Sequence, residues 1–410
     1  MRNNPFLSKV FTSTWLKHFA SNKTTYHFDF INGVSFLKDK YFPIYFNAGK
    51  NITNGMYYDI DLDKTDYLGK TFLIYDVPEY YGMEFMQAGD LNLKKIRQYK
   101  GYSANFQDFE TFEDYFINKY KSSSRYKFRK GIKRLETCFD IEYKIIYGEI
   151  SKEEYEFIFK HFKLILSKRF GSLGLDNSIL SEWDYYHELV YNMILEKKAL
   201  INVVYNNGTP IGLSIGFLAD EIMYFAISTF NIDYIKFNLG HTVIIKLMEW
   251  CFENDIKTFD FSKGQYEYKD RWANHQYNYH CHILYDSSSI KAKIVANIMS
   301  SFFKLKQYLR DKKVNFLYSI LKFKLKGISS KYKGSNYAVS VLKDEKIDLE
   351  ILTEINLDHD DYSMLRKPLF SYLFSKAEKL KTMQIYKNNS VDGLYYAVGA
   401  NNNLKISKSN

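Results

Sequence analysis

The order of strand-like and helix-like segments between residues 199 and 285 constrains the fold of this chain most strongly. Three β-rich runs, one amphipathic helix and two further β-rich runs follow one another, and the helix carries an apolar stripe that suits packing on a sheet. This order predicts a mixed α/β fold with a helix crossing between strands. In chain order the six segments are Leu200–Tyr205, Pro210–Leu218, Ile222–Thr229, Leu239–Asn254, Lys257–Phe261 and Asn278–Tyr285.

The segments outside this region have a less regular order. Residues 1–120 combine strand-like runs with a helix expected near Gly89–Tyr99, and residues 111–135 have a helical pattern that ends in a basic cluster. A helix expected over Asn177–Lys198 precedes the ordered region. A long amphipathic helix is expected after residue 290, and a strand at Tyr337–Leu342.

Length and composition exclude several classes of protein. The 410 residues are 46% hydrophobic and 25% charged, which excludes general disorder and leaves room for two or three domains. Cys138, Cys251 and Cys281 lie far apart without a CxxC pair, so we expect a reducing compartment rather than a disulfide scaffold. The chain has neither a secretory signal nor an apolar run of about 20 residues. We therefore expect a cytoplasmic protein that at most touches the inner face of the cell membrane.

The basic charge is concentrated in two stretches. The formal charge is +10, yet residues 291–334 hold twelve Lys and Arg against the single acid Asp311, so the rest of the chain sums to −1. Residues 121–134 form a second cluster with seven basic residues and no acid. Each stretch is either a solvated helix face or a docking site for phosphates on a nucleotide, a lipid or a tRNA. For residues 291–334 we expect an anionic membrane surface as partner.

The motifs within the ordered region resemble a known family. The order of segments resembles the acyl-CoA-binding core of the GNAT fold. The local sequence resembles the branch named after the cellulose-biosynthesis protein CelD, which is akin to the Fem peptidyltransferases. The resemblance covers about residues 1–285. The motifs that carry it are Leu239-Gly240-His241, Phe259-Asp260-Phe261-Ser262-Lys263-Gly264 and Tyr268-Lys269-Asp270-Arg271-Trp272.

This resemblance implies two GNAT-like lobes in tandem with a basic helical C-terminal extension. The implied parts are a degenerate lobe over 1–120, a basic linker over 121–138, the acyltransferase domain over 139–290, a basic amphipathic helical segment over 291–334 and an extension over 335–410.

The resemblance also implies an acyl-CoA-dependent N-acyltransferase that uses acetyl-CoA or another acyl-CoA as co-substrate and no metal. The amine acceptor would belong to an amino sugar or a lipid-linked precursor of surface polysaccharide. The alternatives are a Fem-like aminoacyltransferase that uses aminoacyl-tRNA and a catalytically inert GNAT fold that only binds.

The helix expected to start near Leu239 is the candidate donor site. The free N–H groups at a helix start suit a pyrophosphate, which assigns Asn238, Leu239, Gly240 and His241 to donor binding. Only one glycine is present there, so Gly240 is alternatively a turn residue before a packed helix. The pantetheine would pair with the edge of the preceding strand, which includes Ile227 and Thr229.

Residues in and between the last two motifs are catalytic candidates. Lys269 would hold donor phosphates or stabilise an oxyanion, or is a solvated surface lysine. Asp260 would orient Lys269 or His241, act as a base, or cap the following turn. By the resemblance, Tyr266 or Tyr268 would protonate the leaving thiolate, or both are ordinary tyrosines of a Tyr-rich chain. The sequence His280-Cys281-His282 is not expected to hold a metal, because alternation along a strand separates the cysteine from the histidines.

Overall fold

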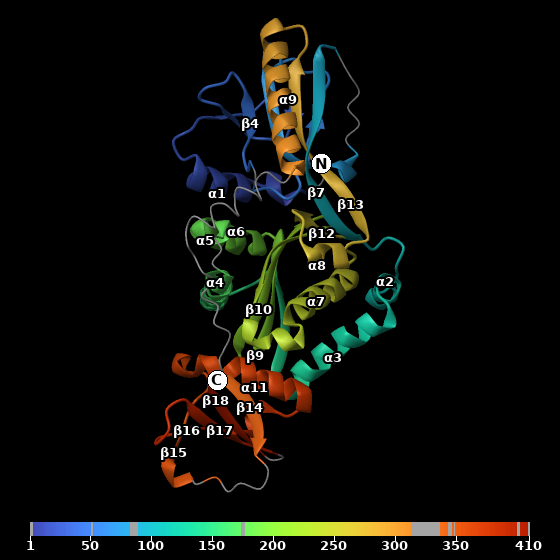
Figure 1. The fold of residues 1–410 in the computed structure, drawn as a ribbon. Helices are drawn as coiled ribbons and strands as arrows, with labels where there is room; N and C mark the ends of the chain where they lie inside the picture. Colours follow the sequence, from blue (N-terminus) through green and yellow to red (C-terminus); the bar gives the residue numbers. More distant parts are fainter. Residues whose placement is uncertain are drawn as a thin grey trace.

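The computed structural model describes residues 3–50, 52–82, 89–173, 177–312, 337–342, 347, 349–399 and 402–408, without the side chains of residues 172 and 173. An eleven-stranded mixed sheet runs through the upper two thirds of the elongated molecule (Figure 1). Its order is β1-β3-β4-β6-β13-β7-β12-β11-β10-β9-β8. The strands are β1 (Thr25–Tyr26), β3 (Phe36–Lys38), β4 (Tyr45–Asn47), β6 (Thr71–Pro78), β7 (Leu91–Asn105), β8 (Ile141–Tyr147), β9 (Ala199–Asn206), β10 (Thr209–Ala219), β11 (Ile222–Phe230), β12 (Thr258–Lys263) and β13 (His275–Asp286).

Helices cover both faces of the half of this sheet that contains β8 to β12. On one face, apolar side chains of α1, α4 and α6 share a core with β9, β10 and β11. On the other face, α7 packs on the same strands, and α2 and α3 pack on α7. Every residue of β9 except the last is therefore buried. The helices are α1 (Lys9–Phe19), α2 (Phe112–Lys119), α3 (Ser122–Cys138), α4 (Lys152–Leu173), α5 (Ser178–Ser181), α6 (Trp183–Leu195), α7 (Leu239–Glu253) and α8 (Glu267–Trp272).

The long antiparallel pair β7–β13 joins the two halves of the sheet (Figure 1). Its register runs from the His275↔Ser103 pair to the Asp286↔Leu91 pair, and β13 also pairs with β6. The helix expected near Gly89–Tyr99 is therefore wrong, because this segment is the first part of β7. Pairing with β13 overrides a helix-compatible pattern of lysines and leucines in this segment.

Beyond the sheet, helix α9 (Ile290–Asp311) packs on β13 and β7, and Ser289 caps its start by accepting a hydrogen bond from the Ala292 N–H. The long helix expected after residue 290 is confirmed to Asp311. Residues 313–334, with Lys322, Lys324 and Lys326, lie outside the described residues.

The C-terminal part forms a separate antiparallel sheet of five strands in the order β14-β18-β17-β16-β15. Helix α11 (Ser363–Lys376) lies between this sheet and the main body, where Phe370 contacts Phe139 with ring centroids 4.8 Å apart. The strand expected at Tyr337–Leu342 is confirmed as β14. The other strands are β15 (Leu352–Glu354), β16 (Gln384–Asn388), β17 (Leu394–Val398) and β18 (Asn403–Lys408).

The predicted fold class, a mixed α/β architecture around a mixed sheet, is confirmed. Short elements complete the description: β2 (Ile31–Asn32) pairs with β5 (Asp59–Ile60), and the 3-10 turns η1 (Pro5–Leu7), η2 (Glu79–Tyr81) and η3 (Ile232–Phe237) lie along the main body. The helix expected over Asn177–Lys198 is present as α5 and α6, with a break at Glu182. In the described residues, no helix has both the length and the apolarity that a membrane span requires.

Candidate active site

Strands β11 and β12 diverge in the middle of the main sheet. They pair in parallel only from Ile222↔Thr258 to Tyr224↔Asp260. Beyond this point β11 continues to Phe230, paired with β10 on its other side. Within the described residues, the β12-facing edge of Phe225–Phe230 therefore has no strand partner, and Asp260 lies where the gap begins.

A β-bulge lies beside this gap. Ile215 pairs with Ile227 and Gly216 pairs with Phe225, so Ala226 is an extra residue in β11. Bulges re-aim side chains and are common next to active sites. A cavity of about 60 Å³ lies next to the bulge. Its lining includes Phe6, Asn54, Phe217, Ala226 and Ile227.

The carboxyl group of Asp260 is fully buried and has four short polar contacts. The Tyr277 hydroxyl lies 2.7 and 2.6 Å from its two oxygens, the Tyr80 hydroxyl donates over 2.7 Å and the Ser262 N–H over 2.6 Å. Burial nevertheless outweighs these hydrogen bonds and raises the pKa of Asp260 to about 6.

The tyrosines around Asp260 form a chain of hydroxyl groups. The Tyr279 hydroxyl donates to the Asn54 carbonyl, and the Tyr277 hydroxyl donates to Tyr279 over 2.9 Å. The Tyr277 hydroxyl has one proton, which it can donate either to Asp260 or to Tyr279, and donation to Asp260 favours the ionised carboxylate. On the other side, the Tyr80 hydroxyl lies 3.3 Å from that of Tyr224.

Gly101 allows Tyr277 to reach Asp260 across an intervening strand. Strand β7 lies between β12 and β13, and Gly101 pairs directly with Tyr277. A Cβ atom on Gly101 would lie 2.2 Å from the Tyr277 ring. The ring therefore crosses the sheet over the backbone of a residue that has no side chain.

Lys269 of α8 is buried, with 4% of its surface exposed, so the solvated-surface interpretation is wrong. Its ammonium donates to the Lys263 carbonyl over 2.8 Å and more weakly to the Ser262 carbonyl. Burial lowers the pKa of Lys269 to about 8, against the opposing effect of the Asp260 charge. Lys269 and Asp260 thus interact electrostatically, and both lie beside Ser262 and Lys263 at the end of β12.

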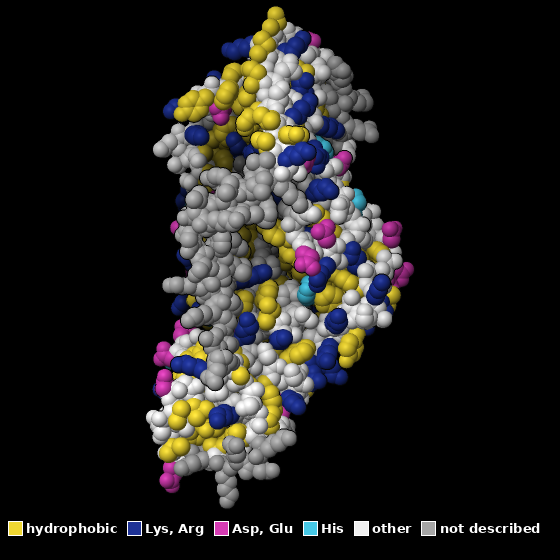
Figure 2. Space-filling model, viewed as in Figure 1, with side chains coloured by type: hydrophobic (Ala, Val, Ile, Leu, Met, Phe, Trp, Pro, Cys, Tyr) yellow, Lys and Arg dark blue, Asp and Glu magenta, His cyan; other side chains and the backbone are white. Residues whose placement is uncertain are grey.

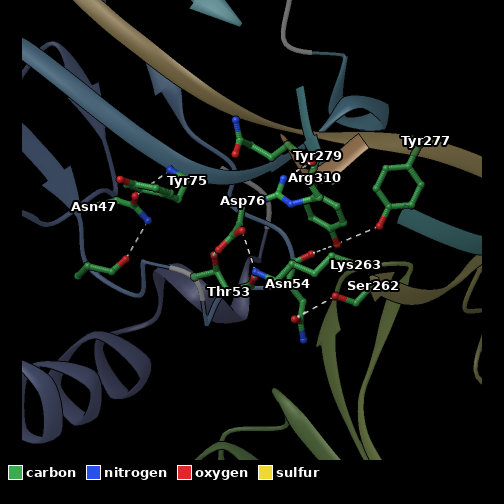
Figure 3. Close-up of polar contacts among 12 residues, drawn as sticks. Asn47, Thr53, Asn54, Tyr75, Asp76, Ser262, Lys263, Tyr277, Tyr279 and Arg310 are labelled. Carbon is green, nitrogen blue, oxygen red and sulfur yellow. Dashed lines mark hydrogen bonds and ion pairs between the residues drawn. The ribbon is translucent and has the colours of Figure 1, made fainter. Parts of the chain in front are cut away.

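A second polar cluster connects residues of the N-terminal segment, Thr53, Asn54 and Asp76, to Ser262 and Lys263 at the end of β12 (Figure 3). The Lys263 ammonium lies 2.7 Å from the buried Asp76 carboxylate and donates to the Thr53 carbonyl over 3.1 Å. The Ser262 hydroxyl donates to the Asn54 side chain over 3.1 Å. Asp76 and Ser262 have φ values of 61° and 64°, so two non-glycine residues occupy the left-handed region at one junction.

The predicted donor-binding residues lie together at the start of α7, but most of their side chains pack inward. Asn238, with φ 57°, precedes the helix, and Leu239 is fully buried. His241 accepts a hydrogen bond from the Trp272 indole over 3.1 Å, and burial lowers the pKa of His241 to about 4. Backbone N–H groups therefore remain the groups that this helix start offers to a phosphate.

Gly240 has a packing role that the sequence did not indicate. A Cβ atom at this position would lie 2.7 Å from the ring of Phe230. The guanidinium of Arg169 in turn lies over the Phe230 ring, 4.5 Å from the centroid of that ring. The close approach at Gly240 is thus to an aromatic side chain at the end of β11.

The other predicted site residues have different surroundings. Ile227 is in the core beside the cavity, and the buried Thr229 hydroxyl has no hydrogen-bond partner among the described residues. Tyr268 is half-buried, stacks with Tyr266 and is separate from the hydroxyl chain around Asp260. His282 contacts the Tyr58 hydroxyl over 2.7 Å. No group of three or more metal-ligand side chains occurs in the part of the chain that the structure describes.

Sequence reasoning missed Tyr80, Tyr277, Tyr279 and Asn54. The alternation of Tyr277 and Tyr279 along a strand was the available signal, because it puts two hydroxyls on one face. Tyr80 and Asn54 come from the N-terminal half, and no local pattern connects them to Asp260.

Comparison with known proteins identifies part of the chain. Residues 122–270 match the family model described as an acetyltransferase (GNAT) domain. This segment is therefore similar to a GNAT acetyltransferase domain. It contains the divergence of β11 and β12, Asp260 and Lys269. No curated protein matches the sequence.

Solved structures similar to the chain include a conserved protein of unknown function from Bacteroides thetaiotaomicron, with 12% identity over 69% of this chain and 92% of that chain and a TM-score of 0.45. FemX has 11% identity over 68% of this chain and 92% of that chain, with a TM-score of 0.46. The PaiA N-acetyltransferase from Thermoplasma acidophilum, in complex with coenzyme A, has 15% identity over 28% of this chain and 74% of that chain, with a TM-score of 0.24.

Proposed function

We propose that this protein is an acyl-CoA-dependent N-acyltransferase of the CelD-like branch. The observation that carries the proposal is the divergence of β11 and β12 at Asp260 within the GNAT domain. The edge of Phe225–Phe230 offers main-chain groups to an extended chain, and pantetheine has amide groups that pair with such an edge.

The start of α7 and the cations near it suit the phosphates of the donor. Arg169 lies over Phe230 at the end of β11, and the charge of Arg271 acts on His241 in the first turn of α7. Helix α3, which carries the basic cluster of residues 121–134, packs close to the same place, since a Cβ atom on Gly131 would lie 2.7 Å from the Phe237 carbonyl. Positive charge thus adds to the N-terminal end of the helix dipole.

Asp260 is the group that removes the proton from the attacking amine. A pKa of about 6 leaves the carboxyl mostly ionised at neutral pH and close enough to that pH to exchange protons readily. Its oxygens are covered by Tyr80 and Tyr277, so the proton passes through one of these hydroxyls. Lys269 either stabilises the negative oxygen of the tetrahedral intermediate or holds donor phosphates.

The small cavity beside Ala226 suits the acyl group. Its volume of about 60 Å³ is far less than the roughly 150 Å³ of a cavity that holds benzene. A short acyl chain, such as acetyl, fits this space. The amine acceptor, on an amino sugar or a lipid-linked polysaccharide precursor, would approach from the N-terminal half, which supplies Tyr80 and Asn54.

A Fem-like aminoacyltransferase is the second candidate, favoured by the basic face of α3. Lys127 and Lys133 are exposed there, and phosphate contacts of this kind make tRNA binding strongly dependent on salt. Incubation of the protein with acetyl-CoA and a panel of amino sugars, followed by mass spectrometry, tests the first function. Acetylated product that disappears in Asp260→Asn supports it. Aminoacyl transfer from charged tRNA without any acetyl transfer would replace it with the second function, and donor binding without turnover would indicate an inert fold.

A further inference from the structure

Helix α9 has two apolar faces, and among the described residues only one of them is covered. The covered face carries small or medium side chains, with one aromatic ring, and packs on β13 and β7. Its buried residues are Ala292, Ala296, Met299, Ser300, Phe303 and Gln307. These residues attach the helix to the sheet and leave the opposite face to solvent.

The opposite face of α9 carries the larger apolar side chains. Each of them lies three or four residues from another member of the set, and together they form one stripe along the helix. Their exposed fractions range from 41% for Leu309 to 75% for Ile290. Figure 2 shows apolar side chains along this upper end of the molecule. The exposed stripe consists of Ile290, Ile294, Ile298, Phe302, Leu305, Tyr308 and Leu309.

Lysines border the stripe on both sides. At about 100° per residue, Lys293 and Lys304 lie along one border and Lys306 along the other. All three are exposed. The one acid of the helix, Asp311, is paired with Arg97. The charge of Lys306 also acts on Lys50 of the N-terminal half, so positive charge extends beyond the helix on that side.

We propose that the exposed stripe of α9 binds the surface of an anionic lipid bilayer. An amphipathic helix with an apolar face and cationic borders lies in the plane of the interface, with its apolar side chains among the acyl chains and its lysines at the headgroups. The charge favours lipid over a second copy of this chain, because a symmetric interface would bring the lysine borders of two molecules together. This binding does not depend on the reaction that the GNAT domain catalyses.

Sedimentation with phosphatidylcholine vesicles, with and without phosphatidylglycerol, tests the proposal on the full chain. We expect the protein to sediment with the anionic vesicles and to be released as salt is added. The triple variant Ile294→Ser, Ile298→Ser, Phe302→Ser should lose at least about tenfold in partitioning while its unfolding midpoint stays unchanged, since these side chains are exposed. A matched control replaces the exposed Ile117, Leu164 and Leu195 with serine and should bind as the parent does.

A second pair of variants tests the charge. Lys293→Gln, Lys304→Gln, Lys306→Gln should weaken partitioning to anionic vesicles by about tenfold or more. Removal of the same charge at the exposed Lys64, Lys160 and Lys376 should change it far less. Three results would overturn the proposal: no sedimentation of the parent protein with anionic vesicles, equal sedimentation with neutral vesicles, or an apolar-stripe variant that changes a dimer to a monomer and leaves vesicle binding intact.

Discussion

The ring of Tyr277 lies directly against the backbone of Gly101, and this contact brings a hydroxyl of β13 to a carboxyl of β12. The two strands are not neighbours in the sheet, since β7 separates them. The buried cluster around Asp260 therefore depends on the absence of a side chain at Gly101 as much as on the polar groups themselves.

The first prediction concerns this contact. Gly101→Ala places a methyl group on the Tyr277 ring, so the ring must move and its hydrogen bond to Asp260 is lost. We expect a loss of unfolding free energy of about 1–3 kcal/mol, measured by urea denaturation. Gly171→Ala, at an exposed helical glycine with no atom within 4 Å of the added Cβ, is the control and should be neutral or slightly stabilising. Equal stability of Gly101→Ala and the parent would contradict the packing described above.

The second prediction uses the raised pKa of Asp260. The pKa of Asp260 is about 6 in the folded protein, compared with 3.8 for an ordinary aspartic acid. Its contribution to stability is therefore complete below about pH 3.8 and is lost as the pH rises through about 6. Relative to Asp260→Asn, the parent protein should therefore lose on the order of 3 kcal/mol of stability between about pH 4 and pH 7. Urea unfolding of both proteins across this range measures the difference, and a constant difference would show that Asp260 has an ordinary pKa.

The third prediction separates the two roles of Lys269. Lys269→Met keeps the apolar stem and removes the charge. If the ammonium stabilises the transition state, kcat should fall by roughly 10²–10³ with little change in KM, and the parent's activity should decline as the pH rises through about 8. If the ammonium holds donor phosphates, KM for acyl-CoA should rise instead. Lys257→Met, at the opposite end of β12, is the control, and unchanged kinetics in Lys269→Met would remove Lys269 from the active site.

The fourth prediction concerns Gly240. The side chain of Gly240→Ala would overlap the Phe230 ring, so we expect a loss of about 1–3 kcal/mol of stability. The loss should be much smaller in a Phe230→Leu background, because the smaller side chain leaves room for the added methyl group. Thermal unfolding of Gly240→Ala, Phe230→Leu and the double variant, compared with the parent protein, gives a double-mutant cycle for this contact. Additive losses would show that the two residues are not in contact.

The sequence predicted the local elements of the GNAT domain well. The strands β9, β10 and β11 and the helix α7 have strong patterns of their own, and the buried side chains of α7 include Val243 and Leu247 from the apolar stripe. Asp260 and Lys269 could be singled out because they belong to a short ordered motif.

The remaining features depend on contacts between distant segments, which no local pattern encodes. Strand β7 forms because β13 and β12 pair with it, although its lysines and leucines suit a helix. Tyr80 and Asn54 reach the site from the other half of the sheet. The sequence also indicated the apolar side of α9 and an anionic membrane surface as partner for residues 291–334, but a local pattern cannot show whether that apolar side packs on the core or stays exposed.

Calorimetric titration of the protein with acetyl-CoA tests the central claim most directly. If the gap between β11 and β12 is the donor site, acetyl-CoA should bind at one site, free coenzyme A should compete with it, and Ala226→Pro at the bulge should weaken the binding by at least about tenfold. Circular dichroism of that variant checks that the fold is retained. Absence of binding at millimolar acetyl-CoA by the intact protein would contradict the claim that this domain uses an acyl-CoA donor.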